Sequence, residues 1–171
     1  MSALLVSDPY TLLSRAMPST LETADSIELL VGRWRPRLLE VDGKTAHEKP
    51  SQDRWSISEV VGHLVDSATN NHQRFVRAQS SDPFVFPKYE QNEWVSAAGY
   101  RHFEWSSLVI LWAEYNRMLA VLIRNVPAAC LATSCTIGPY APCTLEFLII
   151  DYLDHMNHHL SILDSRIGNL G

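Results

Sequence analysis

Two histidines near the C-terminus are spaced for joint metal binding. His155 and His159 are four residues apart, so a helix brings both imidazoles to one side. Two neutral imidazoles one turn apart form a chelating pair for zinc or nickel. His158 points about 100° away from His159 on the same helix and should face outward. The other interpretation of the pair is an ordinary helix surface with two solvated rings.

A helical pair supplies only two ligands, and His63 is the candidate for the third. It lies at the border of an apolar arc, and polar groups beside a buried face cost free energy unless something pairs with them. A metal ion with its surrounding hydrogen bonds would explain those groups, whereas the alternative for His63 is a hydrogen-bonded core histidine. The remaining histidines His47, His72 and His102 have no matching partner and are expected at the surface. The polar stripe next to His63 consists of Glu59, Asp66, Ser67, Asn70 and Arg74.

Three neutral ligands would leave a fourth position open, which is the arrangement of catalytic zinc. A bound water would then have its pKa lowered toward about 7, and a bound thiol would ionise. The expected reactions are hydrolysis of an ester or amide and attack of a thiolate on an electrophile. Asp66 lies one turn after His63 and Asp151 one turn before His155. Each carboxylate is a candidate to orient an imidazole or to add a fourth ligand, and each could equally be a solvated helix residue.

Four stretches with helical periodicity must position these residues. The first covers residues 21–38, and Pro36 should kink or end it near Trp34. The second begins at Ser56 with an S-x-x-E capping box and runs to about residue 78. The third covers residues 105–126, and the fourth extends from an N-cap at Thr144 to Gly168. A short extra helical turn is expected at Asp8.

Strand-like alternation is nearly absent, so these helices are expected to form one all-α domain over residues 1–171, a four-helix bundle. The connections at residues 41–54, 80–103 and 127–143 are longer than most bundle turns, which suggests a function or a crossover. The middle one carries candidates for lining a substrate cavity. Packing of a long crossover against the bundle explains them equally well. These candidates are Tyr89, Gln91 and Trp94.

Composition excludes several functions for the 171 residues. The chain is 46% hydrophobic and 19% charged with a net charge of -5, which is typical of a soluble globular protein and argues against DNA or RNA binding. No apolar stretch approaches the ~20 residues that span a bilayer, and the N-terminus lacks a secretory signal. Three cysteines, Cys130, Cys135 and Cys143, suit neither a disulfide framework nor a tight zinc knuckle. We expect a cytoplasmic protein without membrane or nucleic-acid partners.

Two separated motifs resemble a known family. DRWSISEVVGHLVDS is similar to the W-S-x-x-E-x-x-x-H-L-x-D signature of the DinB/YfiT-like proteins, and DYLDHMNHHLSIL is similar to their terminal H-x-x-H-H signature. The likeness covers about residues 20–163. It implies a four-helix bundle with a long crossover and a zinc or nickel ion held by His63, His155 and His159. It also implies a homodimer, a small-molecule substrate and, in thiol-dependent relatives, a thiol cofactor.

Three hypotheses follow for function. The first is a metal-dependent enzyme, either a hydrolase or a thiol S-transferase. The second is a non-catalytic module that binds a metal or a ligand, which a fourth protein ligand closing the site would favour. The third is a purely structural dimer with solvated histidines.

Overall fold

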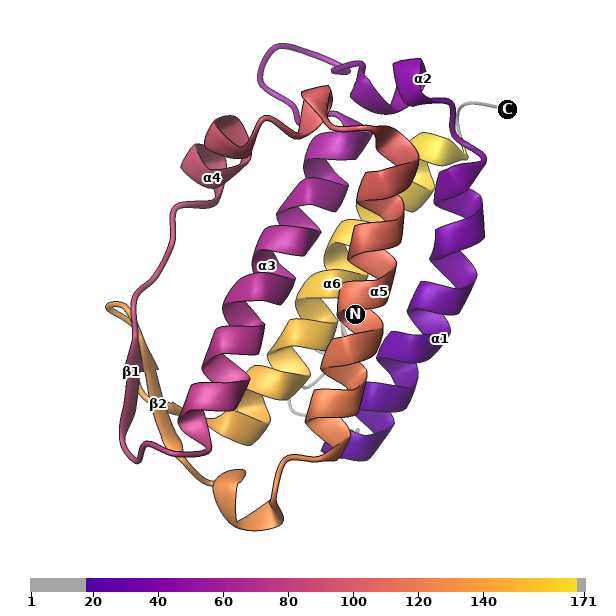
Figure 1. The fold of residues 1–171 in the computed structure, drawn as a ribbon. Helices are drawn as coiled ribbons and strands as arrows, with labels where there is room; N and C mark the ends of the chain where they lie inside the picture. Colours follow the sequence, from indigo (N-terminus) through magenta and orange to yellow (C-terminus); the bar gives the residue numbers. More distant parts are fainter. Residues whose placement is uncertain (1–17, 169–171) are drawn as a thin grey trace, which may run out of the picture.

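Four long helices form a bundle in the computed structural model, which describes residues 18–168 (Figure 1). The chain ascends in the first helix, descends in the next two and ascends in the last, so the middle two helices are parallel. Of the four long helices, the first packs against the third, and the second packs against the fourth. The predicted bundle with a long crossover is confirmed, whereas the turn expected at Asp8 lies outside the described residues. The helices are α1 (Thr20–Leu39), α3 (Ile57–Ala78), α5 (Trp105–Arg124) and α6 (Leu145–Ile167).

The helices that carry the candidate ligands begin where the sequence predicts. The backbone N–H of Glu59 donates to the Ser56 hydroxyl over 3.2 Å, and the Ser56 N–H donates to the Glu59 carboxylate over 2.7 Å. This reciprocal capping box satisfies two N–H groups that the first turn of α3 would otherwise leave unpaired. At the start of α6, the Thr144 hydroxyl accepts from the Phe147 N–H over 3.1 Å. Both caps fix which residues begin the helices, and so which faces the histidines occupy.

Of the two outcomes predicted at Pro36, a kink or an end of the helix, the end is wrong, because α1 continues to Leu39. Proline has no N–H, so the carbonyl of Gly32 loses its helical partner. Gly32 is exposed, and water can take that hydrogen bond. Trp34 and Leu38 on either side of the proline are both buried in the core. Their burial outweighs the lost bond.

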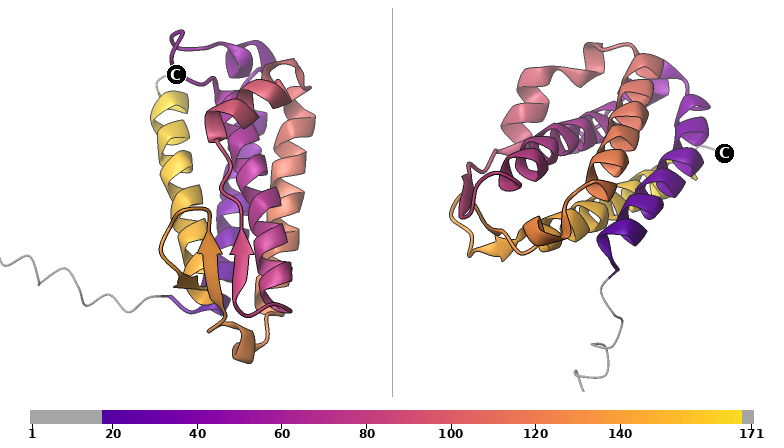
Figure 2. Two further views of the ribbon diagram at one scale, coloured as in Figure 1. Left: turned by 90° about the vertical axis from the view of Figure 1, so that its left-hand side faces the viewer. Right: turned by 60° about the horizontal axis from the view of Figure 1, so that its bottom comes forward.

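A small three-stranded sheet lies beside the bundle, where strands were not expected (Figure 2). Its strands are only three, four and two residues long, too short to show an alternating pattern in sequence. The central strand β2 (Ser134–Ile137) pairs in parallel with β1 (Phe84–Phe86) and antiparallel with β3 (Cys143–Thr144). The sheet therefore joins two of the long connections. These two connections also contain the short helices α4 (Gln91–Ala98), η2 (Tyr100–His102) and η3 (Ala128–Cys130), and the connection between α1 and α3 contains α2 (Gly43–His47).

The crossover between α3 and α5 is fastened to α3 by one aromatic residue. The Tyr100 ring lies directly over Gly62, so closely that a Cβ at that position would come within 2.1 Å of a ring carbon. The Tyr100 hydroxyl donates a hydrogen bond to the buried carboxylate of Asp66, one turn further along α3. Glycine at position 62 is therefore required for the close approach of the ring.

Helix α5 is, within residues 18–168, the one helix long and apolar enough to cross a membrane, contrary to the expectation that no stretch comes close. Core helices of soluble proteins have the same length and composition. Leu108, Trp112 and Leu119 are fully buried, and α5 packs against both α1 and α3. The hydroxyl of Tyr152 on α6 also donates to the buried Asn116 side chain of α5. The bundle core therefore accounts for the buried face of α5, whereas Ile110, Leu111, Met118 and Val121 on the same helix are exposed.

We predict that Gly62→Ala destabilises the protein by about 1–3 kcal/mol, because the added methyl group collides with the Tyr100 ring. The free energy of unfolding, measured by urea denaturation, checks this. Gly32→Ala is the matched control: nothing lies within 4 Å of the added Cβ, so it should stabilise α1 by up to about 1 kcal/mol. In a Tyr100→Ala background the cost of Gly62→Ala should disappear. An equal cost in both backgrounds would show that the collision is not its cause.

Candidate metal site

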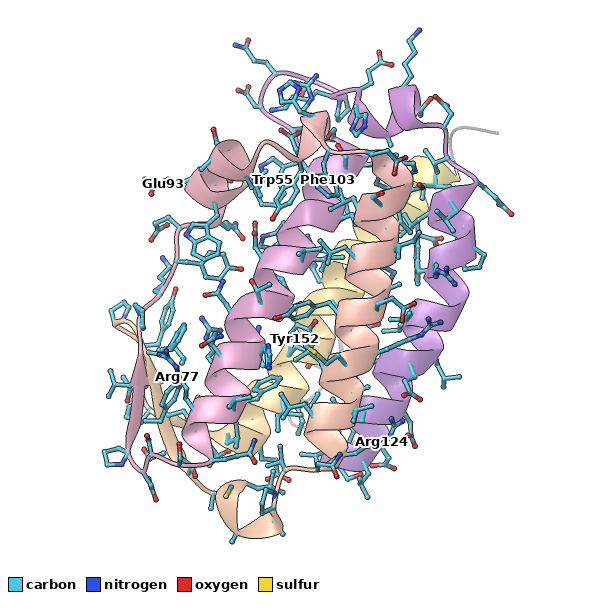
Figure 3. The ribbon with its side chains drawn as sticks, viewed as in Figure 1. Trp55, Arg77, Glu93, Phe103, Arg124 and Tyr152 are labelled. Atoms are coloured by element: carbon cyan, nitrogen blue, oxygen red, sulfur yellow. The ribbon has the colours of Figure 1, made fainter. Side chains whose placement is uncertain are left out.

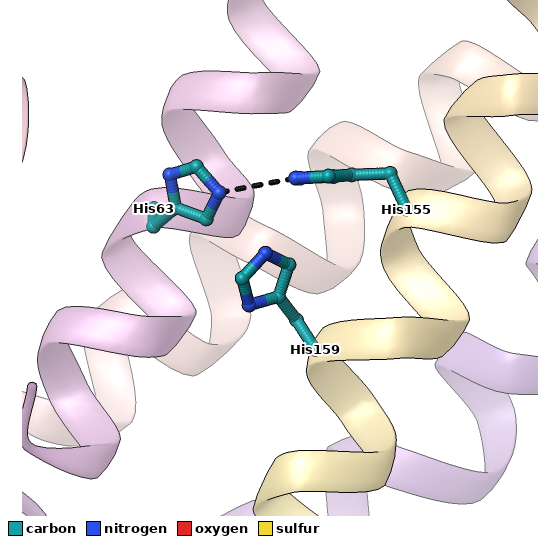
Figure 4. A group of neighbouring side chains, drawn as sticks. All are labelled: His63, His155 and His159. Carbon is teal, nitrogen blue, oxygen red and sulfur yellow. Dashed lines mark hydrogen bonds between the residues drawn. The ribbon is translucent and has the colours of Figure 1, made fainter. Parts of the chain in front are cut away.

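Three imidazoles from two helices meet inside the bundle (Figure 4). α3 contributes His63, and α6 contributes His155 and His159 one turn apart. One nitrogen from each ring lies within 4.8 Å of one nitrogen from each of the other two. The Nε2 atoms of His63 and His155 face each other at 3.1 Å. The three residues that the sequence singled out are thus brought together.

The donor atoms fit a divalent cation. Zinc–nitrogen distances of about 2.0–2.1 Å place two nitrogens of a tetrahedral site about 3.3 Å apart, close to the separation of the His63 and His155 Nε2 atoms. The Nδ1 atoms of His63 and His159 are buried without a hydrogen-bond partner in the described structure. A cation bound between the rings would be the common partner of the nitrogens that converge, which in His63 and His155 are the Nε2 atoms. Nδ1 of His63 lies on the other side of its ring, so the cation would not pair with it.

Burial keeps all three imidazoles neutral, which metal binding requires. Loss of solvent, together with the charges of the neighbouring His159 and His155 rings, lowers the pKa of His63 to about 3. The pKa of His155 falls to about 4, first through burial and then through the charges of His158 and Arg74. The pKa of His159 also falls to about 4, through burial and the other two histidines of α6.

Two neighbours hold the rings in place. The Ser67 hydroxyl lies 3.3 Å from Nδ1 of His155, which leaves Nε2 of that ring to face the cluster. The Trp55 ring, labelled in Figure 3, lies 5.0 Å from the His63 ring and 6.5 Å from the His159 ring. Reasoning from the sequence missed both contacts. A search for side chains one turn from each histidine would have found Ser67, but nothing in the sequence pairs Trp55 with α6.

Neither candidate carboxylate joins the three histidines, among the residues described. Asp66 is buried and bonded to Tyr100, its other oxygen is unpaired, and burial raises its pKa. Asp151 is exposed and lines a cavity beside α6. The geometry therefore gives no support for a fourth carboxylate ligand or for a direct hydrogen bond from either aspartate to an imidazole. Their roles stay predictions.

The three candidate cavity residues line different spaces. Tyr89 and Gln91 line a cavity of about 490 Å³ together with Asp151. Gln91 also lines a cavity of about 300 Å³ that reaches His159 and Trp55. The Trp94 ring is tilted against that of Tyr89, at 4.9 Å between ring centroids, and both residues border a third cavity away from the histidines. Gln91 thus stands between the metal cluster and the cavity of about 490 Å³.

The other histidines and the cysteines lie outside the cluster. His158 and His102 are exposed as predicted. His47 and His72 are not simple surface residues: both are half-buried, and their rings bond to side chains on neighbouring elements. Their partners are the hydroxyls of Ser58 and Tyr115. Cys130, Cys135 and Cys143 are all free thiols.

The depressed histidine pKa values predict that the metal-free protein loses stability as the pH falls. In the unfolded chain the imidazoles bind protons near pH 6.5, whereas the folded ones resist protonation until about pH 3–4. The unfolded state therefore binds more protons in this window, and the free energy of unfolding decreases from about pH 6.5 downward. The free energy of unfolding is measured by urea denaturation at pH 7 and at pH 4.5, with a chelator present.

Two variants separate the loss of stability that comes from the cluster from the loss that comes from carboxyl groups. His63→Ala should show a smaller loss of stability between the two pH values than the wild type. His102→Ala removes an exposed imidazole that lies outside the cluster and should behave as the wild type. Equal losses in all three proteins would contradict the assignment of the pH dependence to the cluster.

Comparisons with known proteins agree with this site. A family model described as the DinB superfamily matches residues 27–163. A Halalkalibacterium halodurans protein named "putative metal-dependent hydrolase" is 27% identical over 116 residues, 68% of this chain and 67% of that one. The "putative metal-dependent hydrolase YfiT" of Bacillus subtilis is 22% identical over 122 residues, 68% of this chain and 66% of that one. The matches span about two thirds of the length of these relatives.

Solved structures show the same fold. YfiT from Bacillus subtilis, described as a probable metal-dependent hydrolase with an unusual four-helix bundle topology, superposes with a TM-score of 0.74 and 17% identity, covering 98% of this chain and 94% of that one. A mycothiol-dependent maleylpyruvate isomerase gives a TM-score of 0.63 and 14% identity over 84% of this chain and 60% of that one. Since the family model matches well over half of the sequence, the chain belongs to the DinB superfamily.

Proposed function

We propose that the protein is a metal-dependent enzyme of the hydrolase type that acts on a small organic substrate. The observation that carries the proposal is the convergence of three neutral, buried imidazoles with no fourth protein ligand among the described residues. Such a set leaves a coordination position for a reactant, as in catalytic rather than structural zinc sites. The names of both curated relatives support metal-dependent hydrolysis.

We assign a role to each residue around the cluster. His63, His155 and His159 would hold a zinc or nickel ion, since imidazole donors suit both metals. When bound, the cation supplies Lewis acidity that polarises an oxygen or sulfur atom of a reactant. Ser67 would orient the His155 ring by accepting a hydrogen bond from its Nδ1–H, so that the lone pair stays on Nε2. Trp55 covers two of the rings and keeps water away from that side.

A second candidate function is thiol S-transfer or thiol-dependent isomerisation. The likeness of the fold to a mycothiol-dependent isomerase supports this candidate. The same imidazole site would then receive a thiol, which ionises readily on a cation. A non-catalytic binding module is not favoured, because no protein side chain in the described part closes the site.

We also propose the size class of the substrate, the cellular compartment and the oligomeric state. A small-molecule substrate fits the cavities next to the cluster, of about 300 Å³ and about 490 Å³. Free thiols at all three cysteines are consistent with a reducing cytoplasm. A homodimer remains a proposal that rests on the family resemblance.

We predict about one divalent metal ion per chain in the purified protein, measured by elemental analysis. His155→Ala should lower metal affinity by more than about 100-fold, because loss of a ligand costs more than the roughly 10–100-fold that loss of an outer hydrogen bond does. Ser67→Ala removes only that outer bond and should fall within that roughly 10–100-fold range. His158→Ala, one residue from His159 but exposed, is the matched control and should bind as the wild type does. Failure of the wild type to take up zinc or nickel would overturn the proposal.

We predict metal-dependent turnover of small esters or amides by zinc- or nickel-loaded protein. Each substrate is assayed with and without an added thiol, and product formation is followed by chromatography. Turnover without thiol supports the hydrolase, whereas turnover that requires thiol supports the transferase. His159→Ala should abolish activity in either case, and His158→Ala should retain it. Fully loaded protein that turns over nothing in either arm would favour a binding module.

A further inference from the structure

Arg74 is a cation without an adequate partner. It lies on α3, half-buried, and no carboxylate of residues 18–168 comes within 4 Å of its guanidinium. Its single hydrogen bond is a long one of 3.3 Å to the side-chain oxygen of Asn71, and its Nε atom is buried and unpaired. A guanidinium carries five N–H donors, so most of its hydrogen-bonding capacity is unused. Burial of such a group costs free energy unless an anion compensates.

The groups around Arg74 do not supply that anion. Its guanidinium carbon lies 5.5 Å from the centre of the Phe86 ring, a weak cation–π contact. Asp151, Tyr89 and Cys143 are close enough to act on it electrostatically, but none of them bonds to it. Glu90, the other acidic group nearby, is paired with Lys88 over 3.0 Å. Nor does Asp151 offer full compensation, because it forms no ion pair with the guanidinium within 4 Å.

Arg74 lines a cavity that is large enough for a small molecule. This space of about 490 Å³ is bounded by α3, α6, the crossover and the small sheet. Its walls include the apolar side chains of Ile137, Phe147 and Leu148. Its charged lining residues are Arg74, Lys88, Glu90 and Asp151, of which Lys88 and Glu90 pair with each other. Apolar walls with a few placed polar groups are the usual form of a small-ligand site.

We propose that Arg74 is the anchor of a carboxylate-binding subsite, and that the ligand is a small organic acid with an apolar body. A guanidinium matches a carboxylate in shape and binds it through two parallel N–H···O bonds. The apolar walls receive the hydrocarbon part. The assignment of this acid as the substrate rests on the proposed function, whereas the binding site itself does not depend on a metal.

The test measures binding of phenylacetate and hexanoate to the full-length chain in chelator, by calorimetry and by NMR shifts. Both acids should bind, and their uncharged amides should bind at least about tenfold more weakly, because one charge-assisted pair contributes roughly 1.5–3 kcal/mol. Arg74→Gln should weaken acid binding by a similar factor. Asp151→Asn should strengthen it, because a competing negative charge is removed.

Arg77→Gln is the matched control for Arg74. Arg77 follows on the same helix, lies 5.9 Å from the same Phe86 ring and is exposed, but it does not line the cavity (Figure 3). This variant should bind both acids as the wild type does. No binding of either acid to the wild type, equal binding of acids and amides, or equal effects of the two arginine variants would each overturn the proposal. Because no metal is present, none of these results depends on whether the imidazole cluster is catalytic.

Discussion

The site depends on one constraint: nitrogen lone pairs from two antiparallel helices must meet, uncharged, at one point inside the bundle. A shift of one residue in either helix would turn its imidazoles by about 100°. The capping box of α3 and the N-cap of α6 fix which residue begins each helix. Ser56 begins α3 seven residues before His63, and Thr144 begins α6 eleven residues before His155. The hydrogen bond from Tyr152 to Asn116 then holds α6 against the core helix α5 from within.

The helices have an unusual order, and this order has the same cause as the cavities. Because α3 and α5 are parallel, the chain must return along the whole bundle between them, and this return segment carries β1, α4 and η2. Tyr100 fastens its far end to Gly62 and Asp66 of α3. The part in between passes over the space beside α3 and α6, where Tyr89 and Gln91 become cavity walls. A bundle with short turns would leave that face open.

Features determined by local sequence were predictable, and features determined by distant contacts were not. The caps at Ser56 and Thr144 and the pairing of His155 with His159 depend on neighbours within one helical turn, so they could be derived from spacing. The continuation of α1 past Pro36 depends on burial of Trp34 and Leu38, which only tertiary packing decides. The sheet could not be foreseen either, since strands this short take their pairing from the bundle that holds them. The same holds for Trp55, whose ring contacts a histidine of α6 more than a hundred residues away.

The distance between the two polar centres limits what a single ligand could be. Arg74 follows His63 by eleven residues on one face of α3, which corresponds to about 16 Å along the helix axis. Side chains of a helix lean toward its N-terminus, so the arginine head group lies closer to the imidazoles than its backbone does, at a separation on the order of 10 Å. Gln91 lines both the cavity of Arg74 and the one that reaches His159. A molecule with its carboxylate on Arg74 and its reacting bond at the cluster would therefore need a spacer of several carbon atoms that passes Gln91.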